Sequence, residues 1–163
     1  MTNLLNSFIK FPAAADPWYS QTERDNSVAF SRKTSRPYRF GHKNASGTNS
    51  LTTAKFLLKI LGSPSGNISA AVFNGTSVEE QSSTDLDVTS ISSSDFEWIS
   101  FDFSGLDVVD DKYIALTTAD NYGAGDDFVL VGVKVETGSS WYVNDGSTTW
   151  VEYTDRNTSV ELL

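Results

Sequence analysis

The most regular alternation of apolar and polar side chains lies in residues 55–74, KFLLKILGSPSGNISAAVFN. Phe56, Leu58 and Ile60 occupy every second position of its first half, which is the spacing of a β-strand with one buried face. The second half, residues 67–74, repeats that spacing, and the intervening Gly-Ser-Pro-Ser-Gly supplies residues suited to a chain reversal. The pattern predicts a β-hairpin that divides the chain into two parts.

Short apolar stretches separated by turns rich in Gly, Asn, Asp and Ser continue after this hairpin. In FEWISFDF, Phe101 and Phe103 share one predicted face, while Trp98 and Asp102 lie on the other. The predicted strands span residues 28–30, 38–40, 55–61, 67–74, 86–88, 96–103, 112–118, 128–136, 141–143, 150–153 and 159–162. These strands, with no convincing helix, predict an all-β, antiparallel sandwich of jelly-roll or related Greek-key type. An immunoglobulin-type sandwich competes with it, but the Cys-Trp-Cys framework of that fold is absent.

The segment before residue 46 has a different character. Apolar residues up to Phe11 could form one amphipathic turn, which Pro12 ends. We predict that residues 1–45 form an extended N-terminal arm with a basic edge segment and that residues 46–163 form the sandwich. The predicted partner-binding residues of the arm are aromatic or basic: Phe8, Phe11, Trp18, Tyr19, Arg24, Arg32, Arg36 and Arg39.

Charge is divided along the chain in a similar way. Residues 1–60 hold nine of the twelve Lys and Arg residues and three acids, a net +6, whereas residues 61–163 carry −15. Such an asymmetry concerns partners and solubility rather than fold. The basic tract of residues 31–43 has three interpretations: an edge strand protected by charge, a contact with an acidic protein, or a contact with nucleic acid. Because the acidic remainder would repel phosphates, nucleic acid is not an expected partner.

Several classes of protein are disfavoured by what the chain lacks. No cysteine is present, which excludes disulfides, thiolate metal sites and cysteine nucleophiles. No apolar run reaches the roughly 18 residues of a membrane-spanning helix, so no membrane contact is expected. The N-terminus has no basic region followed by a long apolar core, so it is a poor signal peptide.

The segments AAVFN, WISFDF, DKYIALTT and TTWVEYTD follow one another in the order of paired jelly-roll strands. In residues 55–162 the chain therefore resembles jelly-roll modules of phage and virus virion proteins, and it is similar to some carbohydrate-binding modules. The resemblance implies a capsid decoration or tail-accessory protein, made in the host cytoplasm and located on the virion surface. It also implies a homo-oligomer, with a trimer as the expected form, and the major capsid protein or another virion protein as partner.

The residues give little reason to expect catalysis. His42 is the single histidine, it has no acid near it in sequence, and no Gly-x-Ser-x-Gly elbow occurs. A glycosidase would need two carboxylates, but acids at alternate strand positions usually form a solvated face. The candidates on predicted strands are Glu97, Asp102, Glu136 and Glu152. We therefore predict a non-enzymatic protein.

Two acidic loops, residues 107–111 and 120–127, contain the oxygen ligands that calcium takes, although neither has the spacing of an EF-hand. Acidic loops are usually solvated, so no cofactor is the first expectation. If an ion is bound, the predicted ligands are Asp120, Asp126 and Asp127.

Aromatic residues in the C-terminal part could stack on sugar rings or belong to a core or an interface. The predicted glycan-binding residues are Tyr122, Trp141 and Trp150. Trp150 and Tyr153 are an odd number of positions apart, so they are predicted to point to opposite faces of one strand.

Two functional hypotheses follow. The first is a non-enzymatic virion structural protein, a capsid decoration protein that attaches through its N-terminal arm. The alternative is a carbohydrate-binding adhesion module, calcium-assisted, that binds host glycans from a phage tail or a cell surface.

Overall fold

The structure is a computed structural model that describes residues 17, 19–30, 39–45, 47–82, 85–120, 122, 127–137, 140–145 and 149–163. In this part of the chain the regular elements are β-strands and one short 3-10 helix, η1 (Val88–Ser90). The strands are β1 (Tyr19–Gln21), β2 (Asn26–Phe30), β3 (Arg39–Lys43), β4 (Asn49–Leu61), β5 (Asn67–Asn74), β6 (Ser77–Gln81), β7 (Leu86–Asp87), β8 (Glu97–Val108), β9 (Tyr113–Thr117), β10 (Phe128–Val135), β11 (Trp141–Asn144), β12 (Val151–Tyr153), β13 (Arg156–Thr158) and β14 (Val160–Leu162). No helix among the described residues is long and apolar enough to cross a membrane.

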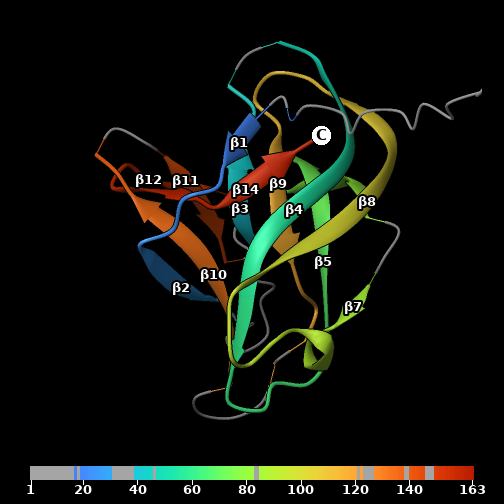
Figure 1. The fold of residues 1–163 in the computed structure, drawn as a ribbon. Helices are drawn as coiled ribbons and strands as arrows, with labels where there is room; N and C mark the ends of the chain where they lie inside the picture. The colour runs from blue at the N-terminus through green and yellow to red at the C-terminus, as the bar shows by residue number, and fades with distance from the viewer. Residues whose placement is uncertain are drawn as a thin grey trace, which may run out of the picture.

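Eight of these strands pair in the order of a jelly roll (Figure 1). Sheet A contains β2-β10-β4-β8 and sheet B contains β3-β9-β5-β6, with antiparallel pairing throughout. The chain crosses from one sheet to the other at most connections, so strands that follow each other in sequence face each other across the core. The predicted antiparallel, jelly-roll-like sandwich is confirmed.

The remaining strands widen both sheets. In sheet A, β14 pairs with β4, β1 pairs with β14, and β13 pairs with β10. In sheet B, β11 pairs with β3 and β12 pairs with β11, while β7 pairs with the start of β5. The first described strand therefore lies beside the last one, close to the C-terminus (Figure 1).

The core lies between the two sheets and follows the predicted alternation. Phe56, Leu58 and Phe101 are fully buried, and Phe103 is nearly so. The rings of Phe56 and Phe101 meet edge to face across β4 and β8, with centroids 6.1 Å apart. Burying one such side chain contributes roughly 1.5–3 kcal/mol, so these alternate residues decide which face of each strand turns inward.

The predicted hairpin in residues 55–74 is wrong. β4 lies in sheet A and β5 in sheet B, so residues 62–66 form an arch between the sheets rather than a turn within one sheet. Alternation shows which side chains a strand buries but not which sheet the strand joins, and both strands bury side chains in the same core. Gly62 and Gly66 have φ of 74° and 117°, conformations that glycine adopts without steric cost.

The boundary predicted at residue 45 does not separate an arm from the sandwich. Residues 19–30 and 39–45 of the predicted arm are described, and they contribute β1, β2 and β3 to the two sheets. β3 lies between β9 and β11, so the predicted basic edge segment is not an edge strand at residues 39–43. The rest of that segment, residues 1–16, 18 and 31–38, lies outside the described residues.

Candidate functional site

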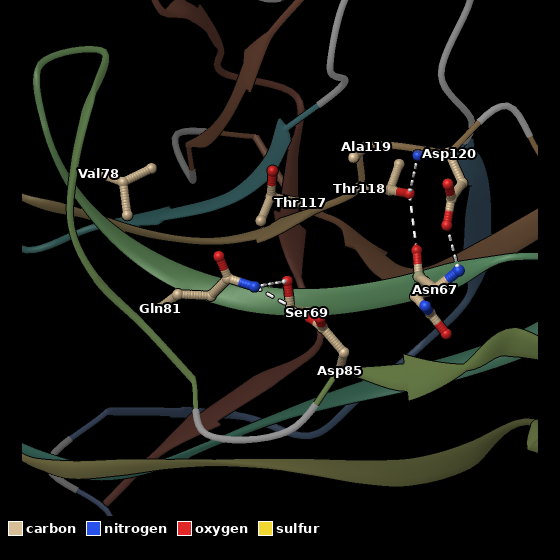
Figure 2. Close-up of a pocket in the computed structure, with 9 residues that line it drawn as sticks. All are labelled: Asn67, Ser69, Val78, Gln81, Asp85, Thr117, Thr118, Ala119 and Asp120. Carbon is tan, nitrogen blue, oxygen red and sulfur yellow. Dashed lines mark hydrogen bonds between the residues drawn. The ribbon is translucent and has the colours of Figure 1, made fainter.

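A cleft of about 320 Å³ lies on the outer face of sheet B, where β5 begins and β9 ends (Figure 2). Small-molecule sites in proteins usually range from roughly 300 to 1,000 Å³, so the cleft could hold a small ligand. The residues that line it are Asn67, Ser69, Val78, Gln81, Asp85, Thr117, Thr118, Ala119 and Asp120.

The pleat of three neighbouring strands places polar side chains in this cleft. Ile68 and Ala70 of β5 point into the core, so Ser69 between them points outward. Ser69 is paired with Thr117 of β9. On the other edge of β5, β6 ends at Gln81, whose side chain reaches Ser69. Three adjacent strands thus present polar groups side by side on one face.

Gln81 organises one wall of the cleft. Its Nε2 donates to Ser69 Oγ at 3.0 Å and to Asp85 Oδ1 at 2.9 Å (Figure 2). Because both amide hydrogens are used, the carbonyl oxygen Oε1 of Gln81 is held in one orientation as an acceptor. Asp85 adds a carboxylate to the same wall, and the described part of the lining contains no Lys or Arg.

Asp120 and Thr118 organise the opposite end. Thr118 Oγ1 donates to the backbone oxygen of Asn67 at 2.7 Å and accepts from the backbone nitrogen of Asp120 at 2.9 Å. Asp120 Oδ2 in turn accepts from the backbone nitrogen of Asn67 at 2.6 Å. The side-chain amide of Asn67 and the hydroxyl of Thr117 form no hydrogen bond with any residue that the structure describes. These two groups are free to contact a ligand.

Three aromatic rings continue the same face of sheet B beyond the cleft. Trp150 lies parallel to Tyr113, with ring centroids 4.3 Å apart and an interplanar angle of 8°. It meets Phe73 edge to face at 5.6 Å. The outer cluster, as we call these three rings, packs with two fully buried small residues, Ala71 and Ala115.

Comparisons with known proteins identify no relative. No family model, no curated protein and no solved structure matches the chain. What the cleft binds is therefore inferred from its own residues.

Two of the three predicted glycan-binding residues are not surface residues. Tyr122 is fully buried, and Trp141 retains 6% of its exposure with its ring against Phe40 at 4.6 Å. Neither ring presents a face to a sugar, because the apolar area of both is used in the core. Trp150 alone lies on an outer face, in the outer cluster. Tyr153, which was predicted to point away from Trp150, stacks on Trp141 at 4.8 Å.

The predicted calcium ligands have structural partners. Asp127 accepts a hydrogen bond from the backbone nitrogen of Ser63 in the arch at 2.7 Å, and Asp120 accepts one from the backbone nitrogen of Asn67, the first residue after the arch. Asp126 lies outside the described residues. No group of three or more His, Asp or Glu side chains suited to a metal occurs in the described part of the chain. Asp120 and Asp127 thus hold the arch in place.

Two arginines of the predicted arm lie on opposite faces of the sandwich. Arg24 crosses the outer face of sheet A beside Gly132, and its guanidinium sits 4.1 Å from the ring centre of Phe96. Arg39 lies on the outer face of sheet B, 4.4 Å from the ring centre of Phe73. They cannot both contact one flat partner surface. The other predicted partner-binding residues, apart from Tyr19, lie outside the described residues: Phe8, Phe11, Trp18, Arg32 and Arg36.

Tyr19, the remaining aromatic residue among the predicted partner-binding residues, is partly buried and packs against the core. Its ring stacks on His42 with centroids 3.7 Å apart, and its hydroxyl accepts from Asn157 Nδ2 at 2.6 Å. Burial lowers the pKa of His42 to about 4, so this histidine is neutral at pH 7. Burial also raises the pKa of Tyr19. His42 is thus a partly buried member of this stack.

Among the described residues, ion pairs join the basic and acidic parts of the sequence. Lys43 and Lys55, from the basic part, pair with Asp111 and Glu161 of the acidic part, at 2.6 and 3.2 Å. Lys134, from the acidic part, pairs with Glu23 and Asp25 at 3.1 and 3.4 Å. Exposed pairs of this kind contribute about 0–1 kcal/mol each. Their main effect is to mix charges that the sequence keeps apart.

Sequence reasoning missed the cleft itself. Ser69 and Thr117 stand at outward positions of otherwise apolar strands, and this was the signal available. Gln81 and Asp85 lie in a Ser-, Thr-, Asp- and Glu-rich stretch, where nothing distinguishes them from solvated residues. Only the pairing of β5 with both β6 and β9 brings the four side chains together.

Proposed function

We propose that the chain is a non-enzymatic structural protein of a virion surface, a capsid decoration protein. It attaches to the major capsid protein or another virion protein through the segment that precedes β1. It is made in the host cytoplasm, and neither nucleic acid nor a membrane is its partner. The resemblance of its strand order to virion modules motivates this proposal, and the placement of β1 supports the mode of attachment.

The observation that carries this mode of attachment is the pairing of β1 with β14. Tyr19, Ser20 and Gln21 are in register with Leu162, Glu161 and Val160, and Tyr19 is further fixed by His42 and Asn157. The segment before β1 is therefore tied to the sandwich at one defined place, beside the C-terminus (Figure 1). A tether with a fixed origin gives all copies of a surface protein the same position relative to their attachment points.

The contact energy of this attachment is assigned to residues before Tyr19. Tyr19 and Arg39 are partly buried against their own domain, and the guanidinium of the exposed Arg24 already contacts the ring of Phe96. Phe8, Phe11 and Trp18 supply the apolar and aromatic side chains that dominate most interfaces. Arg32 and Arg36 would steer the approach to an acidic capsid surface.

The test compares the full chain with a variant that begins at residue 17, which keeps β1 and therefore the sandwich. Both are mixed with particles purified from lysates of cells that carry the gene, and binding is measured by co-sedimentation. The full chain should co-sediment, and the shortened chain should remain in the supernatant with an unchanged thermal midpoint. Equal binding of a folded, shortened chain would overturn attachment through this segment.

The second candidate function is adhesion to carbohydrates. The cleft on sheet B, with the outer cluster beside it, favours this candidate, because it joins hydrogen-bonding groups to aromatic rings on one open face. Calcium is not needed for this version of the hypothesis, since Asp120 and Asp127 already bond the backbone. The two candidates are compatible, because a virion surface protein can also bind a host glycan.

A further inference from the structure

We infer that the cleft at the start of β5 binds a neutral saccharide, one or two sugar units of a larger glycan. This inference deepens the second candidate function, on which it rests. It assigns glycan binding to strand residues of β5, β6 and β9 that no sequence pattern singled out. It does not depend on attachment through the N-terminal segment.

The groups that line the cleft match the hydroxyls of a sugar. A sugar hydroxyl donates and accepts at once, so it is best met by an acceptor and a donor placed side by side. Asp85 and the Oε1 atom of Gln81 supply acceptors on one wall. The hydroxyl of Thr117 and the side-chain amide of Asn67 each supply a hydrogen-bond donor and an acceptor. The cleft therefore offers complementary partners on several sides of one ring.

The Gln81 wall is formed before a ligand arrives. Its two hydrogen bonds, to Ser69 Oγ and Asp85 Oδ1, fix the side chain in one rotamer. Ordering a flexible side chain on binding costs about 0.5–1.5 kcal/mol, and this cost is already met in the free protein. Small polar ligands gain most from such preorganised groups, since each of their contacts contributes little.

The charge of the cleft selects against acidic ligands. Asp85 and Asp120 line it, and no Lys or Arg is among the lining residues that the structure describes. Two like charges about 4 Å apart repel by roughly 1 kcal/mol even in water and by more at a protein surface. A phosphate, a sulfate or the carboxylate of a sialic acid is therefore disfavoured. Neutral hexoses and N-acetylhexosamines carry the required hydroxyls without this penalty.

The outer cluster provides an apolar flank for a longer glycan. Ser69, Ala71 and Phe73 are alternate residues of β5 and lie on its outer face, so the polar cleft continues directly into the aromatic rings. The C–H faces of sugar rings pack well on flat aromatic side chains. A sugar bound in the cleft would thus extend its neighbour toward the partly exposed Trp150.

The experiment applies the full chain to an array of neutral, N-acetylated, sialylated and sulfated oligosaccharides. The strongest neutral glycan is then titrated by calorimetry against three variants. Thr117→Val replaces the cleft hydroxyl by a methyl group of the same shape, and Gln81→Ala removes the organised wall. Thr53→Val, the matched control, makes the same Thr-to-Val replacement on the outer face of sheet A. Thr53 pairs with Asp102 of β8 and is not among the residues that line the cleft.

The inference predicts binding to neutral glycans only, weakened about tenfold or more by Thr117→Val and Gln81→Ala and unchanged by Thr53→Val. Undiminished binding by folded cleft variants would overturn the site but leave glycan adhesion standing. A preference for sialylated or sulfated glycans would overturn the inference of a neutral saccharide but leave glycan adhesion standing. No signal from any glycan on the array would overturn both. None of these results bears on particle attachment. If Gln81→Ala fails to fold, the shape-conserving Thr117→Val decides.

Discussion

Asp120 Oδ2 accepts a hydrogen bond at 2.6 Å from the backbone nitrogen of Asn67, the first residue of β5. This contact closes the arch between β4 and β5, and it explains an acidic residue that the sequence alone presents as a calcium ligand. Replacing Asp120 by Ala leaves that N–H without its partner. We expect the free energy of unfolding to fall by about 1–2 kcal/mol, as measured by urea denaturation.

The conservative variant Asp120→Asn keeps an acceptor oxygen and should lose less stability than Asp120→Ala. Added calcium should leave the thermal midpoint of the unmodified chain unchanged, because the carboxylate already bonds the backbone. A midpoint that rises with calcium in the unmodified chain, and not in Asp120→Ala, would show that the loop is an ion site after all.

His42 should make the protein less stable in mild acid. Burial holds its pKa at about 4 in the folded state, against an ordinary value of 6.5. The unfolded chain therefore takes up a proton below about pH 6.5 that the folded chain refuses until about pH 4, so stability falls across this window. At about 1.4 kcal/mol for each pH unit, the loss amounts to roughly 2 kcal/mol between about pH 7 and pH 5.

The control for this prediction is His42→Phe, which keeps a ring against Tyr19 but cannot titrate. Urea denaturation from neutral to mildly acidic pH should show a smaller decline for the variant than for the unmodified chain. Carboxylates such as Asp25 and Glu80, whose pKa values hydrogen bonds lower, contribute the same background decline to both proteins. Parallel curves for the two would show that His42 is not the titrating group.

Gly41 and Gly132 should respond differently to the same substitution. A Cβ on Gly41 would overlap the carbonyl oxygen of Ile114 and come within 2.7 Å of the Cβ of Ala115, both on the rigid neighbouring strand β9. At Gly132 the nearest atom is the Cδ of Arg24 at 3.0 Å, part of a flexible side chain. Gly41→Ala should lower the free energy of unfolding by about 3 kcal/mol or prevent folding. Gly132→Ala should lower it by less than about 1 kcal/mol. Similar denaturation midpoints for the two variants would contradict this packing of β3 on β9.

Trp150 and Trp98 provide a matched pair of outer-face tryptophans. Trp150→Ala removes the stack on Tyr113 and the hydrogen bond from Nε1 to the backbone oxygen of Gly75 at 2.6 Å. It should lower the free energy of unfolding by about 2 kcal/mol, because the ring is only partly buried. Trp98 on β8 is 36% exposed, so Trp98→Ala should lower the free energy of unfolding by less than about 1 kcal/mol. Equal losses would mean that the outer cluster does not stabilise the fold.

Much of the fold could be predicted from the sequence, because burial of alternate residues is a local signal. Phe56, Leu58, Phe101 and Phe103 lie on the predicted faces of their strands and are buried. The strands themselves are longer than predicted, since β4 begins at Asn49 rather than at residue 55 and β8 ends at Val108 rather than at residue 103. The assignment of strands to sheets could not be predicted in the same way. A strand in an arch and a strand in a hairpin have the same alternation, so residues 55–74 were given the wrong connection.

The site was harder to predict, since its residues are distinguished only by their neighbours in space. Tyr122 and Trp141 were candidate glycan-binding residues, with a core position left open as the alternative, and each fills part of the core. Asp120 was chosen for its charge, and its actual bond to Asn67 joins the segment after β9 to the start of β5, which is distant in sequence. Outward polar residues such as Ser69 look like ordinary solvated positions until β6 and β9 are placed beside them.

The most direct test of the proposed function is to measure the chain in purified particles. Particles are isolated by density gradient from lysates of cells that carry the gene, and the chain is quantified against the major capsid protein by mass spectrometry. A decoration protein should be present at a constant ratio to the capsid protein across preparations, and it should be labelled by antibodies on intact particles. Absence of the chain from washed particles, with the chain recovered free in the lysate, would contradict the proposal.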